Sequence, residues 1–205
     1  MAIYIARHGE TRWSSQNIVQ GRKDSELTKE GIQQAILLSH FFYGIKVNAL
    51  FSSPLGRAYN TAKFISGRHQ IPIILEDCLT EKCCGTAEGV HKSELSRRSE
   101  KDSDKLSRYR FCYPGGENYE DLEGRLQYFT DQISRLYIKE NAVIVAHKAI
   151  NKILIKLLCN LDIDKVLAMD VPNEYIYCIE GNKICYSRIH EKEYKQGFVM
   201  KRSEL

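Results

Sequence analysis

The chain has 205 residues, of which 43% are hydrophobic and 27% are charged, a composition that argues against a disordered protein. The 30 Lys and Arg residues exceed the 26 Asp and Glu residues enough for a net charge of only +4. That excess is too small for a dedicated nucleic-acid-binding protein and suits a small anionic substrate. The length predicts a single domain over residues 1–205.

The apolar segments, the N-terminal residues and the cysteine spacing exclude several other classes of protein. No apolar segment approaches the ~20 residues that a membrane-spanning helix needs. The N-terminal segment lacks the basic region and long apolar stretch of a signal peptide. The seven cysteines are an odd number and show no zinc-type spacing. We therefore expect a reduced, cytoplasmic protein that binds neither membrane nor nucleic acid.

The first half of the chain alternates strands with helices. Ala2–Ala6 is rich in β-formers and predicts a buried strand that runs into a polar loop. Thr28 is a suitable N-cap for a helix. The apolar positions of that helix recur at Ile32, Ala35, Ile36, Ser39 and Phe42. A second strand is predicted at Ala49–Ser52, then a helix that begins near Ser53 and carries Ala58, Ala62 and Ile65 on one side, and then a short strand at Ile71–Leu75.

The second half contains the clearest helical pattern. From Tyr119 to Leu136 the apolar positions follow one another at steps of three and four residues. Ala142–Ala146 is a continuous apolar run and predicts a central strand, which a helix over 150–158 follows. Tyr175–Ile179 and Lys183–Ile189 predict a terminal hairpin. The alternation indicates an α/β fold, a three-layer αβα sandwich with a mostly parallel central sheet and helices on both faces.

The segment His91–Arg110 has a different character from its surroundings. It holds seven basic and four acidic residues, and thus most of the net charge of the protein. Two interpretations remain open: a solvated helical excursion, or a charged lid over the active site that faces the ligand.

Cationic or imidazole side chains follow three of the predicted strands. Arg7 and His8 follow the first strand, Arg57 lies just after the second, and His147 follows the central strand. In an α/β sheet ligands bind at the carboxyl ends of the strands, so these side chains are expected to meet. Arginine presents a planar fork of donors that matches phosphate oxygens, and a neutral histidine can attack phosphorus. The pattern predicts a pocket for a phosphate dianion.

These residues belong to a longer pattern that resembles the histidine phosphatase superfamily, also called the phosphoglycerate mutase-like family. Its N-terminal signature stands intact as Arg7-His8-Gly9-Glu10-Thr11. Collinear matches continue through Trp13, Gln20-Gly21, Asp24, Leu27-Thr28, Gly31, Gln34-Ala35, Ser52 to Ala58, Thr61-Ala62, Leu79-Thr80-Glu81, Gly85, Glu88-Gly89, Pro114-Gly115-Gly116-Glu117 and His147.

The resemblance implies a two-step phosphoryl transfer. His8 would attack phosphorus, and Arg7, Arg57 and His147 would hold the equatorial oxygens. Glu81 would protonate the leaving group and then deprotonate water. Glu88 is a rival carboxylate, whose alternative role is to stabilise the loop through hydrogen bonds. Since arginines supply the positive charge, we expect neither a metal nor a cofactor.

Departures from the family pattern affect the predicted substrate-binding residues, which are Ser14, Gln20, Gly21, Lys148, Ala149, Arg97 and Arg98. Ser14 replaces an asparagine and has a shorter reach toward phosphate. Lys148 and Ala149 replace glycines. Lys148 would strain the backbone, add positive charge beside the phosphate, or point into solvent. Cys83, Cys84 and Ala87 would give one wall of the site smaller and softer side chains.

Three functions are compatible with this set. The leading prediction is a metal-independent phosphomonoesterase that hydrolyses a small phosphorylated metabolite through a phosphohistidine. The first alternative is a phosphoglycerate mutase-type phosphotransferase, in which Arg97-Arg98 would bind a carboxylate. The second is a phospho-ligand binding protein with weakened catalysis. The oligomeric state stays open, because a homodimer is common for such folds but no interface is legible in the sequence.

Overall fold

The computed structural model describes residues 2–95, 104–136, 140–181 and 183–201, and these contain a seven-stranded sheet. Its strands are β1 (Ile3–Arg7), β2 (Ala49–Ser52), β3 (Ile73–Leu75), β4 (Ala142–Ala146), β5 (Tyr175–Glu180), β6 (Lys183–Arg188) and β7 (Lys195–Gln196). They lie in the order β3-β2-β4-β1-β5-β6-β7. The first four strands in that order pair in parallel, and each of the last three pairs antiparallel with the strand before it. The sheet is therefore mixed, and the predicted terminal hairpin is confirmed.

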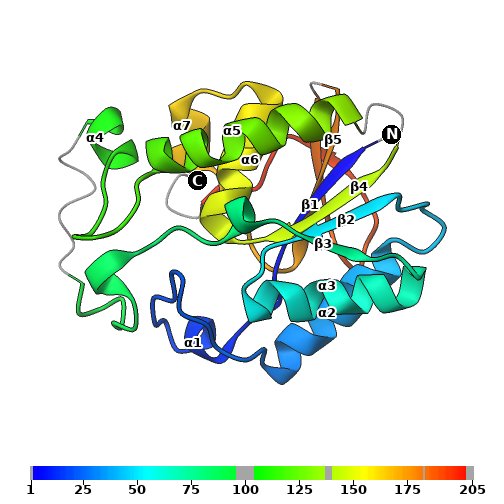
Figure 1. Ribbon diagram of the computed structural model, residues 1–205, viewed down its shortest axis with the longest axis horizontal. Coiled ribbons are helices and arrows are strands. Elements are labelled where there is room, and N and C mark those ends of the chain that lie inside the picture. The colour runs from blue at the N-terminus through cyan, green and yellow to red at the C-terminus, as the bar shows by residue number, and fades with distance from the viewer. Residues whose placement is uncertain (1, 96–103, 137–139, 182, 202–205) are drawn as a thin grey trace.

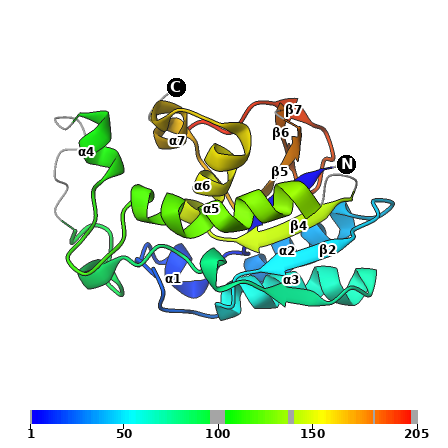
Figure 2. The ribbon, with the colours of Figure 1, turned by 45° about the horizontal axis from the view of Figure 1, so that its top comes forward.

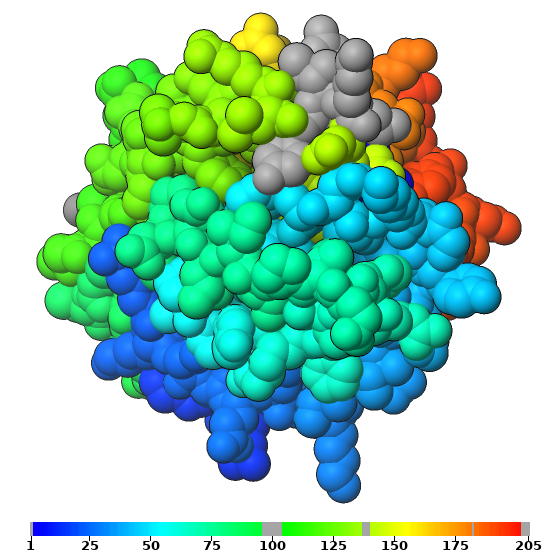
Figure 3. All heavy atoms as spheres, turned by 45° about the vertical axis from the view of Figure 1, so that its right-hand side comes forward, coloured from blue at the N-terminus to red at the C-terminus, as the bar shows by residue number. Residues whose placement is uncertain are grey.

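Helices cover both faces of the sheet, which confirms the three-layer architecture (Figures 1 and 2). The α-helices are α1 (Arg12–Ser15), α2 (Lys29–Phe41), α3 (Gly56–His69), α4 (Lys105–Tyr109), α5 (Tyr119–Leu136), α6 (Lys148–Cys159) and α7 (Ile163–Ala168). Helices α2 and α3 lie on one face, and α5, α6 and α7 lie on the other. The space-filling view of Figure 3 shows the side of the molecule formed by α3 and the edge strand β3, whose atoms are coloured cyan to green.

Strand β1 separates the two halves of the core. Ile3 and Ile5 pack with the residues of α5 and α6, whereas Tyr4 packs with those of α2 and α3. This alternation follows from the two-residue period of a strand. Because both faces are covered, the run is apolar throughout and carries no polar positions until Arg7.

The helical periodicities were predicted with unequal success. In α5 the expected positions Leu122, Leu126 and Ile133 are buried, although Leu136 at its end is exposed. In α2 the predicted face was partly wrong, because Ile32 is exposed and Leu38 is buried instead. Phe41 at the end of α2 contacts the Tyr4 ring edge-on, at a centroid distance of 6.5 Å. This contact helps to fix how the helix is rotated against the sheet.

The sequence did not predict α1, α7 or β7, and it indicated α4 only as part of a helical excursion over 91–110. Each is six residues or shorter, too short for a hydrophobic period to repeat. Among the described residues, no helix is both long and apolar enough to cross a membrane.

Candidate active site

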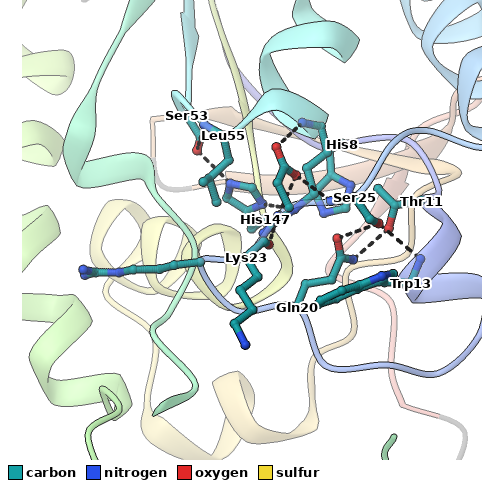
Figure 4. Close-up of polar contacts among 12 residues, drawn as sticks. His8, Thr11, Trp13, Gln20, Lys23, Ser25, Ser53, Leu55 and His147 are labelled. Atoms are coloured by element: carbon teal, nitrogen blue, oxygen red, sulfur yellow. Dashed lines mark hydrogen bonds and ion pairs between the residues drawn. The ribbon is translucent and has the colours of Figure 1, made fainter. Parts of the chain in front are cut away.

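The strand ends meet at one edge of the sheet. Arg7 pairs in register with Ala146, and the His8 amide donates to the Ala146 carbonyl at 3.0 Å. The Ser53 amide, one residue beyond β2, donates to the Val145 carbonyl at 3.1 Å. The His8 and His147 rings consequently lie beside each other, with centroids 5.1 Å apart (Figure 4).

The glycine and glutamate of the N-terminal motif have structural roles. A Cβ on Gly9 would lie 2.3 Å from the Gly31 carbonyl oxygen, so only glycine allows the loop to touch the start of α2. The Gly9 amide donates to Thr61 Oγ1 of α3 at 3.0 Å. The Glu10 carboxylate accepts a 2.8 Å hydrogen bond from Thr28, the confirmed N-cap of α2. The motif thus binds the end of β1 to two helices.

His8 has the protonation state that a nucleophile requires. Its Nδ1 lies 2.7 Å from the Gly9 carbonyl oxygen. Because a carbonyl only accepts, Nδ1 carries the hydrogen and Nε2 keeps its lone pair. The ring is buried, and burial together with Arg7 and Arg57 holds the pKa of His8 well below its ordinary value. The imidazole is therefore neutral at pH 7.

His147 has the opposite tautomer. Its Nδ1 accepts a hydrogen bond from Arg57 Nε at 3.3 Å, so the ring hydrogen is on Nε2. Nε2 donates to Ser53 Oγ at 2.8 Å (Figure 4). Burial, and then Arg57, lowers the pKa of His147 well below its ordinary value. A neutral His147 can act as a hydrogen-bond donor but not as a full positive charge.

Arg57 is buried at the start of α3 and is firmly fixed by the loop over residues 20–25. Its Nη1 donates to the Lys23 carbonyl at 2.8 Å and to Asp24 Oδ1 at 2.9 Å. Its Nη2 donates to the Gly21 carbonyl at 2.7 Å. With the bond to His147, four of its five N–H groups have acceptors among the described residues. One Nη2 hydrogen is left for a ligand in this arrangement.

Arg7 is the cation that faces the predicted acid. Burial lowers the pKa of its guanidinium, and the nearby charges of Glu81 and Asp170 oppose that change. Its Nη1 donates to the Val171 carbonyl at 3.2 Å. Its buried Nε has no hydrogen-bond partner within the described part of the chain. An unpartnered buried donor beside His8 suits an anionic ligand.

The two rival carboxylates occupy different environments. Glu88 Oε1 accepts from the backbone amides of Arg22 and Cys84, each at 2.9 Å. Glu88 therefore holds two loops together, which is the structural role left open for it. Glu81 accepts a hydrogen bond only from the adjacent Lys82 amide, at 2.8 Å, among the contacts of the described residues. Of the two, Glu81 has fewer hydrogen bonds within the described residues, and its charge acts on Arg7.

The predicted substrate-binding residues before α2 have mainly local partners. The Ser14 hydroxyl donates to the Thr11 carbonyl at 2.8 Å and, in the α1 capping box, accepts from the Thr11 amide at 2.9 Å. Its hydrogen is thus used within the loop, which speaks against the direct phosphate contact considered from the sequence. Gln20 binds Thr11 Oγ1 at 2.8 Å through its amide nitrogen (Figure 4). Gly21 has a positive φ of 54° and presents its carbonyl to Arg57.

The predicted substrate-binding residues after β4 lie at the start of α6. Lys148 has ordinary helical geometry, so the predicted strain is wrong. Its Nζ forms an ion pair with Asp170 Oδ1 at 2.5 Å, so it does not simply point into solvent. Ala149 is buried and packs in the core, so its methyl group contributes to the support of the site. Arg97 and Arg98 lie outside the described residues.

The charged segment 91–110 is described only at its two ends. His91 pairs with Ile18, so the segment begins beside the loop that follows α1. At its other end Tyr109 is fully buried and packs on Tyr119 of α5, with ring centroids 5.2 Å apart. Whether the segment forms a lid therefore remains a prediction.

Sequence reasoning missed the loop that precedes β5. Asn173 Nδ2 donates to the His8 carbonyl at 2.5 Å, two residues from the Val171 carbonyl that binds Arg7. The only local signal is the dipeptide Pro172-Asn173 before a strand, which marks a turn but not a catalytic support. This loop therefore contacts both Arg7 and His8.

Other features lie apart from this chemistry. A surface groove of about 520 Å³ lies between α2 and α3, and none of the catalytic candidates lines it. The described residues include no cluster of His, Cys, Asp and Glu arranged to hold a metal. All seven cysteines are free, and Cys178 alone among them is buried. Burial raises the pKa of Cys84 to about 11, so this thiol near Glu81 stays protonated.

Comparison with known proteins agrees with this geometry. A sequence model of the histidine phosphatase superfamily (branch 1) matches residues 3–186, and the chain belongs to this family. A relative from Hydrogenobacter thermophilus, named "Putative phosphoserine phosphatase 2", is 31% identical, over 91% of this chain and 97% of its own length.

Two further comparisons extend the range of activities among similar proteins. A 2,3-bisphosphoglycerate-dependent phosphoglycerate mutase from Rhizobium etli is 30% identical, over 82% of this chain and 84% of its own. The solved structure of a mycobacterial glucosyl-3-phosphoglycerate phosphatase with VO3 superposes with a TM-score of 0.74. It is 20% identical and covers 96% of this chain and 97% of its own, a likeness that shows the fold.

Proposed function

We propose that the protein is a phosphomonoesterase that hydrolyses a small phosphorylated metabolite through a phosphohistidine on His8. The observation that carries this proposal is the buried, neutral His8 with a free Nε2 lone pair between Arg7 and Arg57. A nucleophile of this kind beside fixed positive charge is suited to attack a phosphate ester.

In the first step His8 Nε2 forms a bond to phosphorus as the ester P–O bond breaks. Glu81 gives its proton to the leaving alkoxide. Arg7 and the remaining Nη2 hydrogen of Arg57 hold the phosphoryl oxygens as negative charge spreads over them. His147 joins them when its Nε2 hydrogen turns from Ser53 Oγ to the phosphoryl group. In the second step water attacks phosphorus, Glu81 takes its proton, and the P–N bond breaks to release phosphate. Because these groups supply the charge and the proton, the mechanism requires no metal.

The substrate class follows from the surroundings of the site and from the named activities of relatives. We expect a phosphate ester whose organic group leaves on the side of Glu81. Phosphoserine and phosphoglycerate esters are the first candidates, because proteins similar to this chain are named for them. Mutase activity is the second candidate function, favoured by the 30% identity to the Rhizobium etli enzyme.

One assay separates these functions. The purified protein is given p-nitrophenyl phosphate, phosphoserine or 3-phosphoglycerate in the presence of EDTA, and released phosphate is measured. Phosphate release supports the phosphatase, isomerisation of phosphoglycerate without release supports the mutase, and binding without turnover supports a phospho-ligand binding protein. Loss of activity with EDTA that a divalent metal restores would contradict the metal-free mechanism.

Vanadate provides a second test of the proposal. It adopts the five-coordinate geometry of the transferring phosphoryl group, and transition-state analogues bind more tightly than substrates. We expect inhibition at vanadate concentrations well below the KM for p-nitrophenyl phosphate. Inhibition that requires concentrations above the KM would argue against an in-line attack by His8.

The remaining expectations concern the state of the protein in solution. A homodimer, a cytoplasmic location and the absence of nucleic-acid binding stay predictions. Light scattering during size-exclusion chromatography measures the first directly, and a mass near 23.7 kDa would identify a monomer instead.

A further inference from the structure

Glu81 depends on other residues for its position. It lies between the short 3₁₀ segments Asp77–Leu79 and Gly85–Ala87, where neither a strand nor an α-helix holds the backbone. Its hydrogen bond to the neighbouring Lys82 amide cannot fix the loop relative to the sheet. An acid that must meet a leaving group within hydrogen-bond reach needs an external support.

Arg125 of α5 supplies a support on the N-terminal side of Glu81. Its Nη1 donates to the Thr80 carbonyl at 2.7 Å and to the Cys78 carbonyl at 2.9 Å. Helix α5 is anchored in the core by Leu122 and Leu126, which are fully buried on either side of Arg125. The residue directly before Glu81 is thereby attached to a rigid element.

Glu117 supplies a support on the C-terminal side. Its Oε2 accepts from the Cys83 amide at 2.7 Å, and its own amide donates to the Cys83 carbonyl at 2.9 Å. Its Oε2 also accepts from Arg125 Nη2 at 3.2 Å, and its Oε1 accepts from Arg22 at 3.2 Å. One ion pair thus fastens both ends of the segment that carries Glu81.

We infer that Arg125 and Glu117 are positioning residues that hold Glu81 at the leaving-group side of the site. The inference rests on the proposed acid–base role of Glu81 and goes beyond it, because the family signature accounts for Glu117 as part of a motif but assigns Arg125 nothing. Their side chains are both 19% exposed, so solvent competes little for these hydrogen bonds.

A rival explanation is that Arg125 binds the phosphoryl group itself. Its positive charge contributes to the lowered pKa of His147, and its buried Nε has no partner among the described residues. The two roles predict different kinetics. A phosphate ligand acts on every substrate, whereas a support for Glu81 matters only when the leaving group needs a proton.

The experiment compares Arg125→Gln with Arg125→Lys and with Arg135→Gln as the matched control. Arg135 is an exposed arginine in the last turn of the same helix, α5. The rate of phosphohistidine formation is measured by rapid quench with p-nitrophenyl phosphate and with an alkyl phosphate such as phosphoserine. For Arg125→Gln we expect a loss of about tenfold or more on the alkyl ester and less than about threefold on the aryl ester. Arg125→Lys should recover part of the loss, and Arg135→Gln should match wild type.

A double substitution makes the test specific. When Glu81 is already glutamine, Arg125→Gln should add no further loss on the alkyl ester, because the pair acts only through Glu81. Vanadate inhibition should stay unchanged in Arg125→Gln. Equal losses on both esters with weaker vanadate inhibition would overturn the inference in favour of a phosphate ligand, and no loss on either ester would also overturn it.

Two further variants distinguish a failure of the inferred support from a failure of the proposed acid. If Arg125→Gln does not fold, Glu117→Gln replaces it, since it keeps the size of the side chain and removes the charge; the same contrast between esters is expected. If Glu81→Gln alone leaves the alkyl ester unaffected, the assignment of the acid has failed rather than its support.

Discussion

His8 and Glu81, which carry the two chemical roles of the proposed reaction, are held by different kinds of structure. His8 follows β1 directly, is buried, and is bonded through its backbone to β4 and to Asn173. Glu81 lies on an irregular loop and is half-buried, and Arg125 and Glu117 bond Thr80 and Cys83 on either side of it. Contacts of its own backbone fix the proposed nucleophile, whereas the segment that carries the proposed acid depends on the side chains of Arg125 and Glu117.

The difference bears on one set of departures from the family pattern, the pocket-wall residues, whereas Ser14, Lys148 and Ala149 depart from it in the other half. Negative charge develops on the same phosphoryl oxygens in every substrate, so the donors around His8 gain from a rigid arrangement. Leaving groups differ between substrates, and the loop that meets them can vary without disturbing the sheet. Cys83, Cys84 and Ala87, the unusual residues predicted for the pocket wall, all lie in this second half.

The largest effect is expected from removing the nucleophile. His8→Ala deletes the covalent step, so kcat for p-nitrophenyl phosphate should fall to below about a few per cent of wild type. His190→Ala is the control, because His190 is exposed and lies far along the chain in a surface turn. A folded His8→Ala protein that keeps more activity than this would rule out attack by His8.

The next effect concerns the cation held by the loop over residues 20–25. Arg57→Ala should lower kcat/KM by the equivalent of about 2–4 kcal/mol, through loss of a preorganised donor and of the bond that fixes His147. Arg188→Ala removes an exposed arginine of β6 and serves as control. A loss of less than about tenfold would place Arg57 outside the phosphate pocket.

A smaller and more selective effect is expected from Glu81→Gln. Formation of the phosphohistidine should slow strongly for an alkyl phosphate, whose leaving alkoxide needs a proton, and little for p-nitrophenyl phosphate. Because Glu81 also activates water, the aryl ester should give a burst of about one equivalent of phenolate per site and then a slow phase. If Glu88→Gln shows this pattern and Glu81→Gln does not, the wrong carboxylate has been assigned.

The smallest effect concerns stability rather than rate. An unfolded histidine takes up a proton as the pH falls below about 6.5. In the folded protein His8 and His147 stay unprotonated in this pH range, because their pKa values lie well below the ordinary value. The unfolded state then binds more protons, so the free energy of unfolding should fall between pH 7 and pH 5, by at most about 1.4 kcal/mol per pH unit for each histidine.

Urea denaturation at a series of pH values measures this dependence. The slope of stability against pH in this range should be smaller for His147→Gln than for wild type, and unchanged for His190→Gln. Equal slopes in all three proteins would mean that the buried histidines take up protons as readily as exposed ones.

The sequence predicted, for a physical reason, that Arg7, His8 and His147 meet at one edge of the sheet. Apolar strands that end abruptly in Arg7, His8 and His147 can deliver those residues only to one edge of the sheet. The sequence could not predict that four of the five Arg57 N–H groups have acceptors within the protein. Two of those acceptors are the backbone carbonyls of Gly21 and Lys23, and every residue has a carbonyl. Which carbonyl points inward depends on the conformation of the loop, and composition does not encode it.

The sequence also could not settle the roles of side chains that are suited to more than one kind of contact. Ser14 is a hydrogen-bond donor at a phosphate-binding position of the family pattern and equally a capping residue, and the local contact with Thr11 takes its hydroxyl. Arg125 occupies an ordinary polar position on an amphipathic helix, where an arginine needs no explanation. Its contacts with Thr80 and Cys78 link segments far apart in the chain, so only the folded structure reveals them.

His8 itself becomes phosphorylated in the proposed reaction, and direct detection of the phosphorylated protein tests this step. Glu81→Gln protein is mixed with p-nitrophenyl phosphate, quenched in alkali within the burst, digested and analysed by mass spectrometry. We expect a phosphoryl group on His8 in nearly every molecule, labile in acid and lost slowly in the native protein. A burst of phenolate with the phosphoryl group on another residue, or turnover by wild type with no phosphorylated protein at any time, would contradict the account.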